Sequence, residues 1–137
     1  MKTHEPYAKQ NPRFFEGNIK KITKDNRSFR EVLYTGPHSQ LVVMSIPPGE
    51  EIGEEVHTKT DQLLVIVDGK GEAILDGKRQ AADEHNVIFV TAGTSHNVRN
   101  TGKKDLKLFT VYAPPAHAAG TIHKTREEAM HEEEEAA

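Results

Sequence analysis

The chain has 137 residues, with 18 lysines and arginines against 21 aspartates and glutamates and a formal net charge of −3. This balance offers no basic surface for nucleic acids or anionic membranes, and no apolar run reaches the roughly 20 residues that a membrane span needs, so we expect neither partner. The absence of cysteine excludes disulfides, thiolate metal ligands and a cysteine nucleophile, and it fits a reducing compartment.

The N-terminal part of the chain is polar and shows no strand pattern. Residues 1 to about 17 contain two prolines, and we predict that residues 1–27 form an arm ahead of the folded domain. The first residues lack the apolar middle of a signal peptide, which together with the missing cysteines predicts a cytoplasmic protein.

From residue 28 to residue 115, short runs of β-branched, aromatic and aliphatic residues alternate with turn residues. The sequence Asp76-Gly77 between two such runs indicates a tight hairpin, because both residues tolerate the positive φ angles of a type I′ turn. Runs at a spacing of roughly 8 to 12 residues predict an all-β fold, a small antiparallel sandwich or barrel. The expected strands are 28–35, 40–46, 61–67, 71–75, 86–92, 96–100 and 106–113, with a further strand after the hairpin turn.

The C-terminal part, residues 116–137, is predicted to be a loop followed by a short acidic helix. Pro114 and Pro115 end the last strand, since proline cannot continue a hydrogen-bonded ladder. Thr125 and Glu128 have the spacing of a capping box, and the acidic residues that follow suit the positive end of a helix dipole.

A candidate functional site begins with Glu55 and His57, whose spacing of two places both side chains on the same face of a strand. Gln62 follows after a short polar bend, and His96 comes later in the chain behind a glycine turn. A barrel could bring these four side chains together on its inner wall, although their spacing alone does not establish it.

The positions of Gly49, Glu55, His57, Gln62 and Gly69 keep every interval of the pattern G-x5-H-x-H-x4-E-x6-G. This is the first motif of the cupin superfamily, which the chain resembles over about residues 40–115. The family consists of small β-barrels of the double-stranded β-helix, or jelly-roll, type that often hold one metal ion. The second family motif, G-x5-P-x-G-x2-H-x3-N, is matched in spacing by His85, Thr91, Gly93, His96 and Asn100.

The chain departs from the family pattern at two ligand positions. Glu55 stands at the place of the first histidine and Gln62 at the place of the glutamate, so one carboxylate is lost and one is gained. Carried over, the resemblance implies that Glu55, His57, Gln62 and His96 bind a divalent transition metal. Two imidazoles with oxygen ligands suit Fe, Mn, Ni, Co, Zn or Cu. In the simpler interpretation, Glu55 belongs to a solvated acidic run and Gln62 only hydrogen-bonds another side chain.

Further residues are expected to line the pocket of the barrel. Tyr112 and His117 flank the proline pair near the expected mouth, and we predict substrate contact or proton transfer for them as catalytic residues. His38 and His123 are weaker candidates for the same roles. Inward positions are also expected for Gln40, Met44, Phe89 and Phe109, with core packing favoured for Met44 and Phe89.

The resemblance implies a metal-dependent enzyme that acts on a small polar metabolite, either a dioxygenase or a sugar or keto-acid isomerase. The alternative is a non-catalytic cupin module that binds a metal or a small ligand. By analogy with other cupins, the chain is expected to form a homodimer.

Overall fold

The computed structural model describes residues 13–136, and its elements follow the predicted strands closely. Each run expected to form a strand does so, within two residues at either end. One short strand near the C-terminus and one helix near the N-terminus were not assigned from the sequence. The elements are α2 (Ile19–Asp25), β1 (Arg30–Thr35), β2 (Gln40–Ile46), β3 (Asp61–Asp68), β4 (Gly71–Leu75), β5 (Lys78–Ala81), β6 (Val87–Val90), β7 (His96–Asn100), β8 (Leu106–Ala113), β9 (Ile122–His123) and α3 (Arg126–Ala136).

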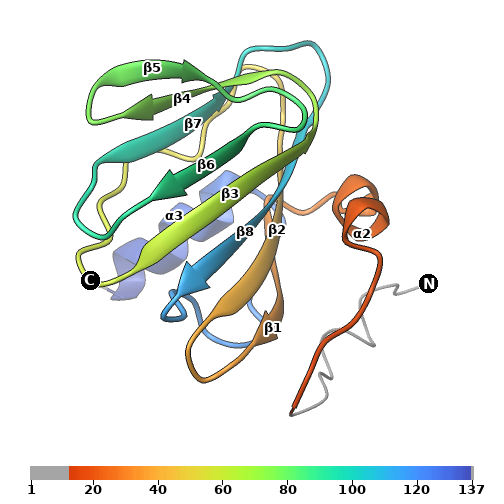
Figure 1. Ribbon diagram of the computed structural model, residues 1–137, viewed down its shortest axis with the longest axis vertical. Coiled ribbons are helices and arrows are strands. Elements are labelled where there is room, and N and C mark those ends of the chain that lie inside the picture. Colours follow the sequence, from red (N-terminus) through yellow and green to blue (C-terminus); the bar gives the residue numbers. More distant parts are fainter. Residues whose placement is uncertain (1–12, 137) are drawn as a thin grey trace.

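The strands form two antiparallel sheets that pack face to face (Figure 1). The larger sheet has the strand order β6-β3-β8-β2-β1-β9, and the smaller sheet has the order β5-β4-β7. One apolar core lies between them, because Val42, Leu64 and Leu108 of the larger sheet cluster with Ala73 and Val98 of the smaller one. The described residues therefore form a jelly-roll of two sheets and not a closed barrel, which confirms the predicted fold class.

Tight turns set the register of the strands where the sequence predicted them. Asp76 and Gly77 have φ angles of 50° and 80°, as the type I′ hairpin between β4 and β5 requires. His85 has a φ of 76°, so histidine takes the left-handed conformation at the position where the family motif has glycine. Gly69 has a φ of 104°, and a Cβ atom there would lie 2.9 Å from the carbonyl oxygen of Asp105, so this motif position requires glycine.

Alternation along the strands decides which side chains face the core. In β8 the buried residues Leu106, Leu108 and Tyr112 face the smaller sheet. The expected inward position of Phe109 is wrong, because this residue lies on the outer face. Met44 faces the core as expected and is fully buried. The expectation of core packing for Phe89 is wrong, because its side chain is 63% exposed and its β6 neighbours Ile88 and Val90 point inward instead.

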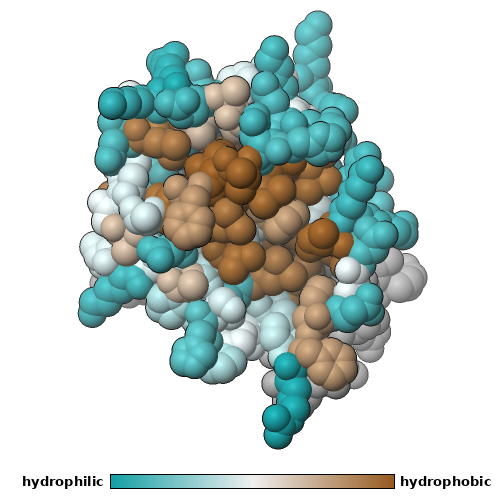
Figure 2. All heavy atoms as spheres, in the orientation of Figure 1, coloured by the Kyte–Doolittle hydropathy of each residue, from teal (hydrophilic) through white to brown (hydrophobic). Residues whose placement is uncertain are grey.

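The outer face of the larger sheet is apolar, and α2 covers only one part of it. Ile22 of α2 packs with Leu33 and Val43 in a second, smaller cluster. Asn18 accepts a hydrogen bond from the backbone nitrogen of Lys21 and so caps this helix, which falls within the stretch that we predicted to be an arm. Figure 2 shows a broad apolar area on the same side of the molecule as β3, β6 and β8.

Helix α3 packs against the core through Ala129, which is 3% exposed. Its start follows the predicted cap, since the hydroxyl oxygen of Thr125 accepts a hydrogen bond from the backbone nitrogen of Glu128. The carboxylate of Glu128 turns back to accept one from the backbone nitrogen of Lys124. Within residues 13–136, no helix is long and apolar enough to cross a membrane.

Candidate metal centre

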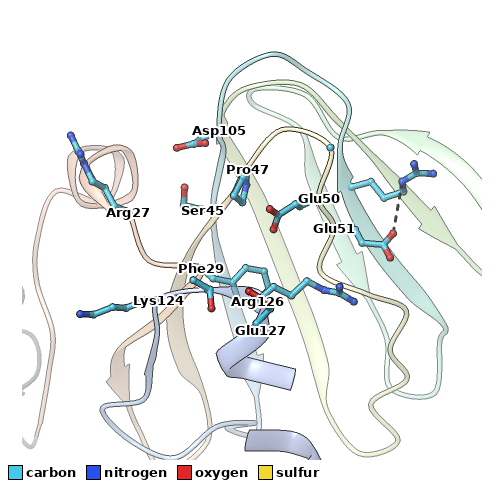
Figure 3. Close-up of a pocket in the computed structure, with 13 residues that line it drawn as sticks. Arg27, Phe29, Ser45, Pro47, Glu50, Glu51, Asp105, Lys124, Arg126 and Glu127 are labelled. Carbon is cyan, nitrogen blue, oxygen red and sulfur yellow. Dashed lines mark ion pairs between the residues drawn. The ribbon is translucent and has the colours of Figure 1, made fainter. Parts of the chain in front are cut away.

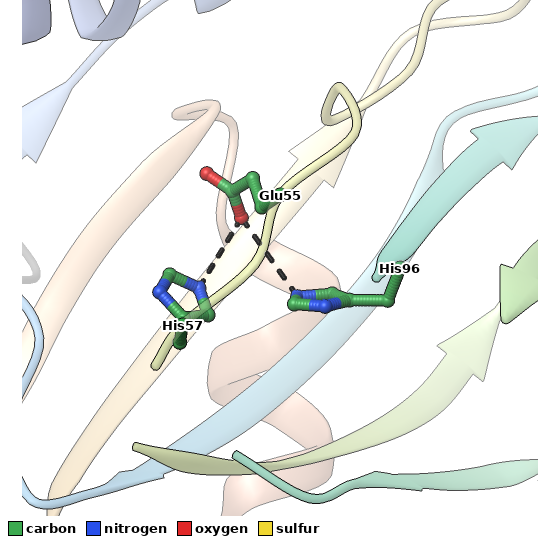
Figure 4. A group of neighbouring side chains, drawn as sticks. All are labelled: Glu55, His57 and His96. Atoms are coloured by element: carbon green, nitrogen blue, oxygen red, sulfur yellow. Dashed lines mark ion pairs between the residues drawn. The ribbon is translucent and has the colours of Figure 1, made fainter. Parts of the chain in front are cut away.

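Three side chains from two segments meet between the sheets (Figure 4). Glu55 and His57 lie in the segment between β2 and β3, and His96 opens β7. Glu55 and His96 form an isolated antiparallel bridge in which each backbone nitrogen donates to the other's carbonyl, at 2.9 and 3.0 Å. The backbone therefore fixes the approach of Glu55 and His96. His57 lies outside the assigned strands, but its side chain reaches the same place as that of Glu55.

The ligand atoms of Glu55, His57 and His96 all lie within 4.8 Å of one another. Oε1 of Glu55 is 3.4 Å from Nε2 of His57 and 4.0 Å from Nε2 of His96. Nε2 of His57 is buried and has no hydrogen-bond partner in the described part of the chain. A buried imidazole nitrogen without a partner next to a carboxylate and a second imidazole fits a transition-metal ion.

Hydrogen bonds determine how His96 presents its ring. Nδ1 of His96 lies 2.9 Å from the carbonyl oxygen of Thr94, an acceptor, so Nδ1 carries a hydrogen and the lone pair of the neutral ring is on Nε2. Oε1 of Gln62 is 3.0 Å from the same Nε2, while the amide nitrogen of Gln62 donates to the hydroxyl of Thr110 at 3.0 Å. A metal ion bound by both atoms would satisfy these two acceptors, as would a second proton on the ring or the flipped amide of Gln62 with the Thr110 hydroxyl as donor.

The carboxylate of Glu55 is held in its ionised form. Burial acts to raise its pKa, but the interaction with His57, the positive charge of Arg30 and the electrostatic effect of His96 together outweigh burial and lower the pKa below its ordinary value. The ionised carboxylate is the form that binds a cation, so the electrostatics of the site are compatible with a metal ligand at this position.

The two predicted catalytic residues lie beside this cluster. Tyr112 on β8 is directly opposite Gln62 on β3, and its ring packs edge-to-face against His57 at 5.8 Å and against His117 at 5.2 Å. Gln40 on β2 pairs with the other side of Tyr112, and its side chain holds the backbone of His117 with two hydrogen bonds, at 2.7 and 3.0 Å. The structure thus brings all six predicted site residues into one neighbourhood.

His117 is half-buried, and its Nε2 has no hydrogen-bond partner among the residues that the structure describes. Burial, followed by the positive charge of Arg30, lowers the pKa of His117 from its ordinary 6.5 to about 4. The ring is therefore neutral at physiological pH and presents an unused nitrogen next to Tyr112.

Sequence reasoning missed Arg30, which is 2% exposed and affects the pKa of both Glu55 and His117. Nη1 of Arg30 lies 3.4 Å from Nδ1 of His123, and Nε2 of His123 lies 3.2 Å from a carboxylate oxygen of Glu132 on α3. The weak candidate His123 is therefore a buried link between Arg30 and α3. The sequence does indicate that Arg30 faces inward, because in the predicted strand it lies two residues from the apolar Val32 and so on the same face. His38, the other weak candidate, is exposed.

A larger cavity of about 770 Å³ lies between the segment after β2 and the start of α3 (Figure 3). None of the three clustered metal-ligand candidates lines it. Its walls carry charges of both signs, and some of these pair with each other, as Arg99 does with Glu51 at 3.8 Å. Its size alone therefore does not single it out as the functional site, and the clustered metal-ligand candidates lie elsewhere.

Comparison with known proteins identifies the class of protein that this fold and cluster define. The family model for the cupin domain matches residues 42–112, which is more than half of the chain, so the chain belongs to the cupin family. Cupin domains commonly bind a divalent metal and small-molecule ligands, and the cluster of Glu55, His57 and His96 could hold such an ion.

Particular relatives cover most of the chain. The uncharacterized protein YrkC of Bacillus subtilis is 44% identical over 126 residues, which are 87% of this chain and 67% of YrkC. The crystal structure of BH2720 from Bacillus halodurans, also 44% identical, matches with a TM-score of 0.86 over 88% of this chain and 96% of that one.

Two more distant relatives have names that state a function. An oxalate-binding protein of Thermotoga maritima is 32% identical over 68 residues, which are 50% of this chain and 56% of that protein. A quercetin 2,3-dioxygenase of Bacillus subtilis is 29% identical over 98 residues, 71% of this chain but only 29% of the enzyme.

Proposed function

We propose that this cupin is a metal-dependent oxygenase of the dioxygenase type, with Fe²⁺ as its metal and a small polar metabolite as its substrate. The observation that carries the proposal is the set of two histidines and one carboxylate, His57, His96 and Glu55, gathered within 4.8 Å. Two histidines and one carboxylate with open coordination positions are typical of non-haem iron oxygenases. The partial similarity to quercetin 2,3-dioxygenase supports the same choice.

The isomerase alternative receives less support from the residues around the cluster. An isomerase must remove a proton from carbon, which favours a base whose pKa is near the working pH. The pKa of His117 is about 4, so this ring is a weak base. It is better suited to accept a hydrogen bond from a substrate hydroxyl.

The chain's own residues can then be given roles. Glu55, His57 and His96 would hold the metal, with Gln62 as a fourth ligand or as the group that orients His96. The bound metal would supply binding sites for a substrate oxygen and for O₂. Tyr112 and His117 would orient the substrate through its hydroxyl groups, and Gln40 would keep His117 in place through the two bonds to its backbone.

Oxygen uptake tests this proposal. Protein purified without added metal is expected to contain near-stoichiometric iron by elemental analysis, and Fe²⁺-loaded protein is expected to consume O₂ with a member of a panel of phenols, keto acids and sugars. An absence of bound metal would overturn the proposal. Turnover of a keto acid or sugar without O₂ consumption would instead establish the isomerase.

A non-catalytic binding module remains the second candidate, and the similarity to the oxalate-binding protein favours it. In that case the metal would be bound, and a small ligand would be retained without turnover across the whole panel. The same oxygen-uptake experiment therefore separates the two candidates, because only the oxygenase consumes O₂.

The homodimer would use the apolar outer face of the larger sheet. Val87 and Phe89 are 62% and 63% exposed on β6, the strand at the edge of this sheet, where an uncovered apolar strand invites association. We expect light scattering to give twice the chain mass for the wild type and a monomer for the double variant Val87→Lys, Phe89→Lys. Ile122→Lys on the opposite edge strand β9 is the matched control and should leave the dimer intact. A monomeric wild type, or a dimer that only Ile122→Lys dissociates, would contradict this interface.

A further inference from the structure

Arg30 is a buried cation that forms no ion pair with a carboxylate of residues 13–136, although its charge lowers the pKa of Glu55. Its side chain lies between the sheets, its guanidinium carbon is 5.3 Å from the ring centre of Phe29, and it is 2% exposed. Its Nε has no hydrogen-bond partner, and across residues 13–136 its one side-chain hydrogen bond goes to the neutral acceptor Nδ1 of His123, at 3.4 Å. Burying a guanidinium in this way is costly unless an anion completes its environment.

A cavity of about 170 Å³ lies directly beside this cation, between the segment before β3 and α3. Arg30 and Glu55 both line it, and so does a second guanidinium, that of Arg126 at the start of α3. Nε of Arg126 donates to the carbonyl oxygen of Ile52 at 3.2 Å, which fixes the side chain while leaving its two terminal nitrogens for another partner. The charged residues that line the cavity are therefore two arginines and two glutamates, Glu54 and the candidate metal ligand Glu55.

The small cavity neighbours the larger one. Arg126 and Phe29 line both cavities, and both residues are labelled in Figure 3. At Gly53 a Cβ atom would lie 2.9 Å from a terminal nitrogen of Arg126, so the glycine allows the guanidinium to pack close against the backbone. A larger side chain at this position would displace Arg126 from the wall.

We infer that this cavity is the subsite for a carboxylate group of the ligand, held by Arg30 and Arg126 while another oxygen of the same molecule reaches the metal at Glu55. The inference rests on the proposed metal centre and adds the chemical class of its ligand. A guanidinium matches the planar geometry of a carboxylate with two parallel hydrogen bonds, and a ligand carboxylate would supply the direct ion pair that Arg30 does not form within residues 13–136. The small volume suits an acid of a few carbon atoms.

Calorimetric titration of Co²⁺-loaded protein tests this subsite, with pyruvate as the probe and pyruvamide as its uncharged isostere. We expect the wild type to bind pyruvate more tightly than pyruvamide. Arg30→Gln and Arg126→Gln should each weaken pyruvate binding by about 10- to 100-fold, as for the loss of a charged hydrogen bond, and leave pyruvamide binding within about twofold. The exposed Arg79 on β5 provides the control variant Arg79→Gln, which should change neither affinity.

The metal content of each sample separates this inference from the proposed function. Protein that takes up no Co²⁺ overturns the metal centre and the subsite together. Protein that keeps its Co²⁺ but binds pyruvate no more tightly than pyruvamide, or binds inorganic phosphate more tightly than pyruvate, overturns the carboxylate subsite alone. If Arg30→Gln does not fold, as judged by its melting curve, the half-buried Arg126 still decides the question, because unchanged pyruvate affinity in Arg126→Gln contradicts the inference.

Discussion

Replacing His57 or His96 by alanine is expected to weaken metal binding by at least about 100-fold. Each substitution removes one of three candidate ligands, and changes that only touch the groups around a ligand already cost 10- to 100-fold in affinity. His57→Ala is the cleaner variant, because Nε2 of His57 makes no hydrogen bond in the described part of the chain that the substitution would break. Equilibrium dialysis of chelator-treated protein against Co²⁺ measures the affinity.

Further variants in the same dialysis experiment distinguish metal ligands from residues that only lie near the metal. Glu55→Gln should also lose metal, because the amide removes the negative charge while keeping the shape of the side chain. Gln62→Ala should cost less, about 10-fold, since Gln62 contributes a neutral oxygen or only orients His96. His38→Ala, at an exposed histidine, is the control. Equal metal content in all variants would show that the cluster is a polar packing arrangement and not a metal centre.

The fold could be predicted because its determinants are local. Alternation of apolar residues and the Asp76-Gly77 turn predicted the strands and the hairpin, and both depend on neighbours along the chain. Helix α2 was missed because its seven residues carry only a narrow apolar stripe, which is stabilised by Leu33 and Val43 from distant strands. The prediction for Phe89 failed for a related reason, since an apolar residue in a strand does not by itself indicate the face on which it lies.

Part of the candidate site could be predicted from the sequence. Motif spacing indicated Glu55, His57 and His96, and the structure shows why the spacing works, because the bridge between Glu55 and His96 joins the two motifs through the backbone. The groups around these three residues could not be predicted in the same way. The carbonyl of Thr94 that orients His96 is a backbone group without a sequence signal, and the second guanidinium comes from α3, beyond the region of the resemblance.

Because of His117, we expect the folded protein to lose stability as the pH falls below neutrality. Its pKa is about 4 in the folded protein and about 6.5 when unfolded, so between these values the unfolded chain binds a proton that the folded chain does not. Stability therefore rises with pH across this window and falls as the pH drops from 6.5 towards 4. The full difference corresponds to about 3 kcal/mol of unfolding free energy, of which most should be lost by pH 4.5.

Urea denaturation of metal-free protein between pH 7.5 and pH 4.5 measures this contribution against the variant His117→Gln. Carboxylates elsewhere in the chain also titrate in this range, but they do so in both proteins, so the difference between the two curves isolates His117. The wild type should lose about 2 to 3 kcal/mol more than His117→Gln, and His38→Gln should follow the wild type. The backbone bonds from Gln40 to His117 are retained in the variant, so its fold at pH 7.5 should be preserved. Parallel curves for the wild type and His117→Gln would mean that the ring is hydrated and free to accept a proton, and the role proposed for it as a neutral hydrogen-bond acceptor beside Tyr112 would fail.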